Sequence, residues 1–162
     1  MKNFQSLLAG ALVLLLAANA HSDAAYKGKV EMIETAAAIA IVEITSTEKV
    51  SVKGKHWIYQ QKAPAKVEQV LKGNLADRVF LYGDENFLCA QCHFEVGRYL
   101  VFLDRDGDLL TGNNWQLSTR KITGEAVEWL DDDKFFEKKS ATLSDVLQEI
   151  EQALAQAKPK KS

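Results

Sequence analysis

The stretch Gly97-Arg98-Tyr99-Leu100-Val101-Phe102-Leu103 is the most apolar strand-like run of the mature chain. Successive side chains of a β-strand point to opposite faces, so Tyr99, Val101 and Leu103 share one face and the two residues between them share the other. Both sets are apolar. The stretch therefore predicts a strand buried on both sides. In a closed barrel that carries a helix, one set would fill the barrel and the other would lie under the helix.

Short strands of similar character surround this run. They are predicted at 39–45, 50–53, 57–59, 66–71 and 78–82, with weaker candidates at 115–117 and 126–130. The alanine-rich segment 31–38 fits either a helical turn or the lead-in to a strand. The aspartates of segment 104–108 alternate like calcium ligands, but the glycine is misplaced for an EF-hand and no glutamate follows, so a solvated hairpin turn is favoured. Strands of this spacing predict a small antiparallel barrel or sandwich.

The last element is predicted to be a helix within residues 140–158. Thr142 can cap its first turn, with Asp145 three residues further on. Its apolar residues recur at helical spacing and form one stripe. The stripe consists of Leu143, Val146, Leu147, Ile150, Leu154 and Ala157. We expect it to pack on the chain's own barrel, and Pro159 to end the helix in a solvated tail, residues 159–162.

The composition suits one domain. The chain has 162 residues, with 20 basic and 22 acidic side chains and a net charge of −2. This balance gives no electrostatic case for binding nucleic acid or an anionic membrane surface. The barrel is predicted to occupy residues 21–139.

Residues 1–20 are predicted to be a signal peptide. Lys2 precedes an apolar run of about a dozen residues, too short for a stable membrane anchor. Ala18 and Ala20 provide the small residues of a cleavage site, and cleavage after Ala24 is a competing possibility. We therefore expect an exported protein, periplasmic or secreted, in an oxidising compartment.

Two motifs carry a family resemblance. The run Ala65–Asn74, with its Val67-x-x-Val70-x-Lys72-Gly73 pattern, resembles a strand end of netrin-like domains, also known from tissue inhibitors of metalloproteinases (TIMPs). The run Phe94–Phe102, which follows a cysteine-bearing segment, is similar to a later strand of the same family. The resemblance covers roughly residues 36–117. It implies a five-stranded oligonucleotide/oligosaccharide-binding (OB) barrel with a flanking helix and a C-terminal α-helix, usually exported.

The resemblance also implies a function by binding, with a protein as the expected partner and a metalloprotease as one candidate. Inhibitors of the family begin with a cysteine that chelates the protease zinc, whereas this chain has no cysteine before Cys89. We therefore predict a non-enzymatic, exported binding module of TIMP/netrin-like type. A secreted metalloprotease inhibitor remains an alternative. The sequence contains neither a serine–histidine–acid set nor a glycine-rich phosphate loop, so it offers no candidate residues for catalysis.

The only cysteines lie in the run Cys89-Ala90-Gln91-Cys92-His93. The favoured interpretation is a local disulfide between Cys89 and Cys92, which needs no cofactor. The same spacing matches the attachment motif of c-type haem, in which His93 would ligate the iron and the protein would transfer electrons. A catalytic redox pair is less well supported, because no βαβ context is present.

Aromatic and terminal residues supply the other candidate sites. Trp57, Tyr59 and Tyr82 could line a ligand groove on the barrel face, together with Trp115 and Trp129, although aromatics in a small β domain more often form core. Cleavage after Ala20 would make His21 the first residue. Its α-amine and imidazole could then chelate a transition metal, with copper(II) the best suited.

Overall fold

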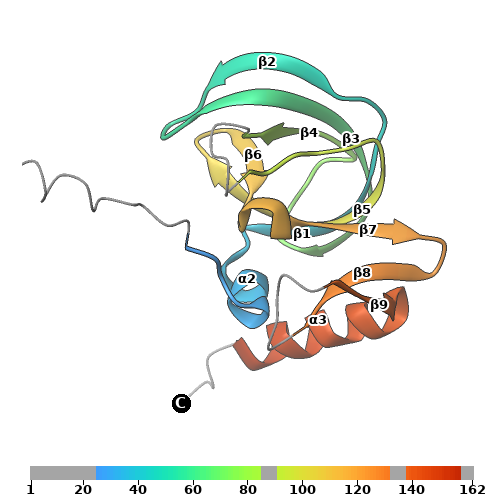
Figure 1. Cartoon of the computed structure of the whole chain (residues 1–162). Helices are drawn as coiled ribbons and strands as arrows, with labels where there is room; N and C mark the ends of the chain where they lie inside the picture. Colours follow the sequence, from blue (N-terminus) through green and yellow to red (C-terminus); the bar gives the residue numbers. More distant parts are fainter. Residues whose placement is uncertain (1–24, 85–90, 132–137, 158–162) are drawn as a thin grey trace, which may run out of the picture.

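The computed structural model describes residues 25–84, 91–131 and 138–157 (Figure 1). The predicted signal peptide, His21, Cys89 and the tail 159–162 lie outside the described residues. No helix in the described part of the chain is long and apolar enough to cross a membrane.

Five strands close into the barrel. In the order of their pairing they are β1 (Ala38–Ile44), β3 (Ile58–Lys72), β4 (Arg78–Gly83), β6 (Leu109–Gly112) and β5 (Gly97–Asp106). β5 pairs again with β1, which closes the sheet. The pairing of β4 with β6 is parallel and the others are antiparallel. The predicted mainly β fold, a small five-stranded OB-like barrel with a C-terminal helix, is confirmed; the parallel pair is an addition to the antiparallel barrel that we expected.

β3 is longer than the sequence indicated. It runs without interruption from Ile58 to Lys72, and so joins the segments that we predicted as separate strands at 57–59 and 66–71. Its first residues pair with β2 (Glu48–Lys53), and its residues from Ala65 onward pair with β1. Pro64 lies between these two pairings, at a break where the missing N–H of a proline is tolerated.

The alternation predicted for β5 is confirmed. Tyr99, Val101 and Leu103 belong to the cluster that fills the barrel, whereas Leu100 and Phe102 belong to a second cluster outside it. We call the second cluster and the elements around it the helical layer. β5 is therefore covered on both faces, as its composition indicated.

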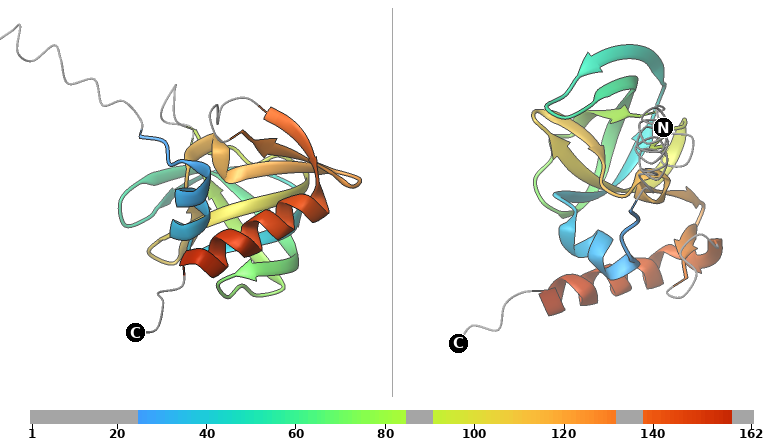
Figure 2. Two further views of the ribbon diagram at one scale, coloured as in Figure 1. Left: turned by 90° about the horizontal axis from the view of Figure 1, so that it is seen from below. Right: turned by 60° about the vertical axis from the view of Figure 1, so that its left-hand side comes forward.

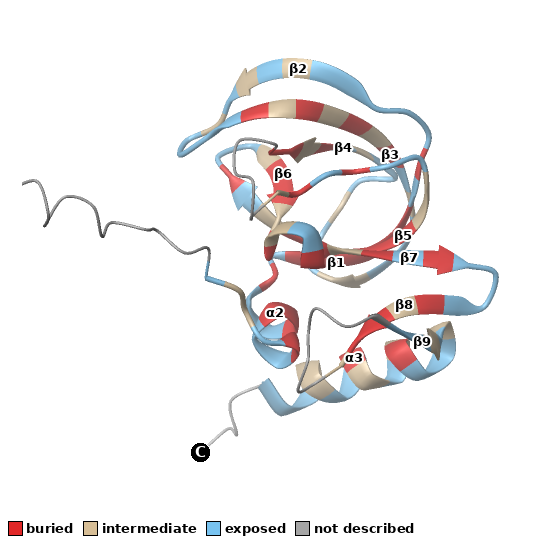
Figure 3. Cartoon of the chain, in the orientation of Figure 1, coloured by how far each residue is buried: buried red, intermediate tan, exposed pale blue. Residues whose placement is uncertain are grey.

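The helical layer lies under the barrel (Figures 1 and 2). It comprises α2 (Lys29–Thr35), β7 (Thr119–Thr123), β8 (Ala126–Leu130), β9 (Lys138–Thr142) and α3 (Leu143–Ala157). The α3 stripe packs on the chain's own domain, with Val146 and Ile150 completely buried (Figure 3). The Thr142 hydroxyl caps α3 by accepting a hydrogen bond from the Asp145 N–H at 3.1 Å, as predicted.

One local prediction was wrong, one open choice is resolved and two strands were missed. The weak strand candidate at 115–117 is a 3-10 helix, η1 (Trp115–Ser118). Segment 31–38, which was left open between a helical turn and the lead-in to a strand, contains both, because α2 extends to Thr35 and β1 begins at Ala38. β7 and β9 were not predicted, because their polar sequences (TRKIT and KKSAT) have little apolar alternation and become strands by pairing with β5 and β8.

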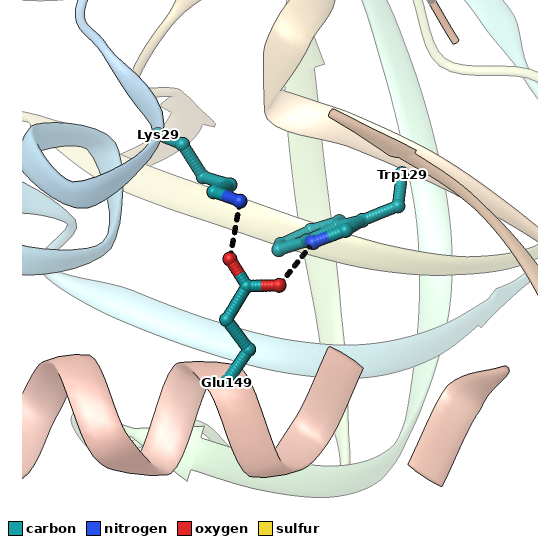
Figure 4. A network of polar contacts seen from close by, with 3 residues as sticks. All are labelled: Lys29, Trp129 and Glu149. Atoms are coloured by element: carbon teal, nitrogen blue, oxygen red, sulfur yellow. Dashed lines mark hydrogen bonds and ion pairs between the residues drawn. The ribbon is translucent and has the colours of Figure 1, made fainter. Parts of the chain in front are cut away.

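A polar network joins three elements of the helical layer (Figure 4). The Glu149 carboxylate on α3 accepts a hydrogen bond from Trp129 Nε1 on β8 at 2.7 Å and forms an ion pair with Lys29 on α2. The Lys29 ammonium also lies 5.8 Å from the centre of the Trp129 ring. Since Lys29 is buried, the ion pair and the ring stabilise a charge that would otherwise be costly to remove from water.

Candidate functional site

A hollow opens at the end of the barrel where the β2–β3 turn meets the turn between β5 and β6. Its volume is about 320 Å³, and its wall includes four aromatic side chains, Trp57, Tyr59, Tyr82 and Trp115. We call this cavity the aromatic hollow. The structure thus brings together Trp57, Tyr59 and Tyr82, which were predicted to share a groove; that the groove binds a ligand stays a prediction. Trp129 does not belong to it, because its side chain is buried in the helical layer.

Asp106 connects the two turns that border the hollow. Its carboxylate accepts hydrogen bonds from the backbone N–H groups of His56 and Trp57, at 2.9 and 3.3 Å, and from Tyr59 Oη at 3.0 Å. The side chain of Trp57 is 45% exposed, although its backbone is held by this carboxylate. Asp106 therefore fixes the position of the turn that carries the exposed indole of Trp57.

The expectation that Asp106 belongs to a solvated turn was wrong. The residue is 5% exposed, and the turn proper is limited to Gly107 and Asp108. Burial alone would raise the pKa of Asp106, but the hydrogen bonds from Tyr59 and from the His56 and Trp57 backbones lower it below its ordinary value. The carboxylate is thus ionised at neutral pH and fully engaged with protein donors.

Trp115 has an unusual backbone conformation. Its φ of +50° makes it the sole non-glycine residue with positive φ in the described part of the chain. This region is unfavourable for a bulky L-residue, and such strain persists only where the surroundings impose it. Here the neighbouring Asn114 side chain exchanges two hydrogen bonds of 2.9 Å with the Lys27 backbone, and Trp115 Nε1 donates to the Ala25 carbonyl at 3.4 Å.

The segment that carries Cys92 closes the barrel next to the hollow. The backbone of Cys92 exchanges two hydrogen bonds with that of Asp84, at 3.0 and 3.1 Å. The buried Gln61 side chain pairs in the same way with the Phe94 backbone, at 2.8 and 3.0 Å. Phe94 is completely buried in the barrel cluster, so the segment acts as a plug.

The thiol of Cys92 is free and buried in the structure. It packs so closely against Gly112 that a Cβ at that glycine would overlap the sulfur. Burial, with a smaller contribution from the charge of Asp84, raises the pKa of the thiol to about 12. A thiol of this kind is protonated and unreactive at neutral pH. The disulfide with Cys89 stays a prediction, because Cys89 lies outside the described residues.

Of the other predicted site residues, His93 is the one that the structure describes, and it does not line the aromatic hollow. His93 is exposed and contacts Gln61 Nε2 through its ring, at 3.2 Å from Nδ1. It lines a different hollow, of about 360 Å³, beside Arg120 and Glu128. Arg120 shares a face of β7 with Ile122, and its Nη2 donates a hydrogen bond to the Gln116 carbonyl at 2.7 Å. Within residues 25–84, 91–131 and 138–157, no group of three or more His, Cys, Asp or Glu side chains is placed to hold a metal ion.

The floor and the rim of the aromatic hollow differ in charge state. The floor consists of the buried lining residues, among them Tyr59, Asp84 and Asp106. Burial and the neighbouring carboxylate of Asp106 raise the pKa of Tyr59 far above its ordinary value. The rim consists of the more exposed lining residues, which include charged groups of both signs. An entering group therefore meets aromatic faces and mixed polar groups before it reaches a negatively charged floor.

No family model matches this chain, and no curated protein matches it either.

Proposed function

We propose that the protein is an exported, non-enzymatic binding module of the TIMP/netrin-like OB type, and that its ligand site is the aromatic hollow. The observation that carries this proposal is the conformation of Trp115. The chain holds a tryptophan in a strained backbone conformation beside the half-exposed Trp57, at the same cavity. A core tryptophan needs no such strain, and backbone strain is concentrated at binding and catalytic sites.

The position of the hollow supports the proposal by analogy of fold. In OB barrels generally, ligands bind over the second and third barrel strands and the loops beside them. The corresponding strands here are β3 and β4, which contribute Tyr59 and Tyr82, and the loops are the two turns that Asp106 connects. The resemblance at residues 65–74 and 94–102 supports the family assignment, and the apolar run before Ala20 supports export.

The haem alternative fits this chain less well. Attachment requires both thiols at a surface that a porphyrin can reach, whereas the Cys92 sulfur is packed under Gly112. A Soret band that survives acid–acetone extraction of the exported protein would establish covalent haem and overturn this preference. The inhibitor alternative lacks the N-terminal cysteine of the family, so we do not propose it.

Export is tested by the intact mass of the protein recovered from periplasm or medium. We expect a mature chain that begins at His21 or within a few residues of it. Cleavage at Ala20 also permits the His21 copper site, which is tested by copper titration against His21→Ala. Recovery of the chain with residues 1–20 attached contradicts the export proposal.

The site is tested with arrays of oligosaccharides, peptides and small amines, probed with the mature protein. We expect at least one class to bind, and binding to fall at least about tenfold in Trp57→Ala, as for a central aromatic of an interface. Phe80→Ala is the matched control, because Phe80 is an equally exposed aromatic, at 51%, that does not line the hollow. Binding that survives Trp57→Ala but not Phe80→Ala would place the site elsewhere.

A further inference from the structure

The aromatic hollow has a chemistry that narrows the class of its ligand; the inference drawn from it rests on the function proposed above. Three charged side chains line its more exposed part, Lys27, Asp104 and Arg105. In the described part of the chain, neither Lys27 nor Arg105 takes part in an ion pair. The Asp104 carboxylate accepts a hydrogen bond from the Arg105 backbone N–H at 2.8 Å. The rim thus offers strong hydrogen-bond donors and acceptors together.

Charged ligands fit the hollow poorly. Asp84, Asp104 and Asp106 all line it, against two permanent cations, so a phosphate or carboxylate group would meet like charge. A cationic group would meet Lys27 and Arg105 at the rim, and it would find the Asp106 carboxylate already bound to three protein donors. A neutral ligand avoids both conflicts.

The size and shape of the hollow favour a ring over a flat protein surface. About 320 Å³ is at the lower end of the range for small-molecule sites, which are concave and lined by aromatics with a few polar groups. A stable protein–protein interface instead buries at least about 1,200 Å² in total.

The indole side chains of the hollow favour a sugar ring as the ligand. A pyranose ring carries apolar C–H groups on its faces and hydroxyl groups around its edge, and each hydroxyl both donates and accepts hydrogen bonds. An exposed indole face matches the first feature, as in other sites where an aromatic ring provides rigid apolar area. The mixed charges of the rim match the second, since hydrogen bonds to charged groups are stronger than those between neutral ones.

We propose that the aromatic hollow binds a neutral oligosaccharide, with a pyranose ring stacked on Trp57 or Trp115 and its hydroxyls bonded to Lys27, Asp104 and Arg105. Trp57 and Trp115 are binding residues in this arrangement. Asp106 is a positioning residue, because its carboxylate acts through the turn that carries Trp57.

The test uses the mature full-length chain and three neutral hexasaccharide probes: β-1,4-linked glucose, β-1,4-linked N-acetylglucosamine and α-1,4-linked glucose. Titration is followed by calorimetry and by tryptophan fluorescence. We expect at least one probe to bind and to change the emission. Affinity should fall at least about tenfold in Trp57→Ala, be largely retained in Trp57→Phe, and be unchanged in Phe80→Ala.

Trp115 needs a different variant, because alanine at a φ of +50° would be strained as tryptophan is. Trp115→Gly removes the indole and suits the backbone conformation, so a loss of binding in this variant reports the indole itself. Salt separates the ligand classes further. Binding of a neutral sugar should differ by less than about twofold between about 50 and 500 mM NaCl, whereas contacts between charges weaken as the Debye length falls.

Absence of binding to all three probes overturns the inference, and so does binding that is insensitive to both Trp57→Ala and Trp115→Gly. A peptide or amine that binds in place of the sugars and depends on Trp57 overturns the oligosaccharide inference but leaves the proposed binding function standing. The two failures are therefore distinguishable in one set of measurements.

Discussion

The barrel interior and the helical layer share β1 and β5 but are filled with side chains of different size. On β1, Ala38, Ala40 and Val42 point into the barrel, with the larger Ile44 only at the end of the strand, whereas Ile39 and Ile41 point into the helical layer. A five-stranded barrel has a narrow interior, so small residues are needed where its strands converge. The helical layer has no such limit, because its helices can lie at whatever distance the side chains require.

This difference suggests that the helical layer mainly provides stability and the open end of the barrel mainly provides the binding site. The helical layer contains large buried side chains such as Trp129, Phe102 and Met32, and burial of this kind is the main source of stability. The barrel interior also buries Phe94 and Tyr99, but Trp57, Tyr82 and Trp115 lie at its open end, where they border the aromatic hollow. Changes to the helical layer should therefore unfold the protein, and changes at the mouth should alter binding while the fold persists.

The largest expected effect comes from removing α3. Truncation after Thr142 retains β9 but removes Val146 and Ile150, each worth about 1.5–3 kcal/mol of burial. The two together amount to a large part of the about 5–15 kcal/mol that stabilises a typical domain. We expect a much lower melting temperature and binding of a hydrophobic dye. An unchanged melting temperature would mean that α3 is not docked.

Glu149→Gln should have the next largest effect. It leaves the buried Lys29 ammonium without its carboxylate, although Trp129 Nε1 keeps an acceptor. Breaking a buried ion pair costs about 3–5 kcal/mol, but the Glu149 side chain is 38% exposed, so we expect about 2 kcal/mol by urea denaturation. Glu151→Gln, on the exposed side of the same helix, is the control and should change little. Equal effects of the two variants would show that the network adds no stability.

Cys92→Ser tests the barrel plug. From the sequence, a short disulfide ring should add little stability, and its loss should therefore matter little. The buried environment of Cys92 changes this expectation, because a serine hydroxyl in that place must be desolvated, at about 1–3 kcal/mol. We expect Cys92→Ser to lower the melting temperature more than Cys92→Ala does. Alkylation of the exported protein with and without reduction then decides whether Cys92 is paired with Cys89.

The smallest effect is expected for Asp106→Asn, at about 1–2 kcal/mol, since the amide accepts hydrogen bonds more weakly than the carboxylate. The pKa of Asp106 is lowered in the folded protein, so its contribution is present above the ordinary carboxyl pKa and is lost as the pH falls through the lowered value. The difference in melting temperature between wild type and Asp106→Asn should thus shrink as the pH falls below the ordinary carboxyl pKa. Asp104→Asn is the control; a difference independent of pH would contradict the assignment.

The sequence predicted those features in which the local spacing of apolar residues shows which side chains are buried. Tyr99, Val101 and Leu103 alternate with apolar residues of the opposite face, and this pattern alone indicated two cores around one strand. The stripe of α3 was equally readable, because residues three and four apart lie on one helix face. β7 was missed because its exposed positions are polar and Arg120 occupies one of its buried ones.

The candidate site depended on contacts that no local pattern contains. Asp106 read as one polar residue of a turn, and only the folded chain brings it to His56, fifty positions away. The sequence contained Trp57, Tyr59, Tyr82 and Trp115 without their arrangement, and the strained φ of Trp115 has no sequence signal, because a tryptophan adopts it only when its neighbours impose it. Periodicity by itself indicated a small β domain, barrel or sandwich, with a C-terminal helix, since burial of apolar side chains repeats along the chain, and the five-stranded barrel was what the family resemblance implied. Tertiary structure alone decided where the barrel is open, since that depends on pairings between residues far apart in sequence.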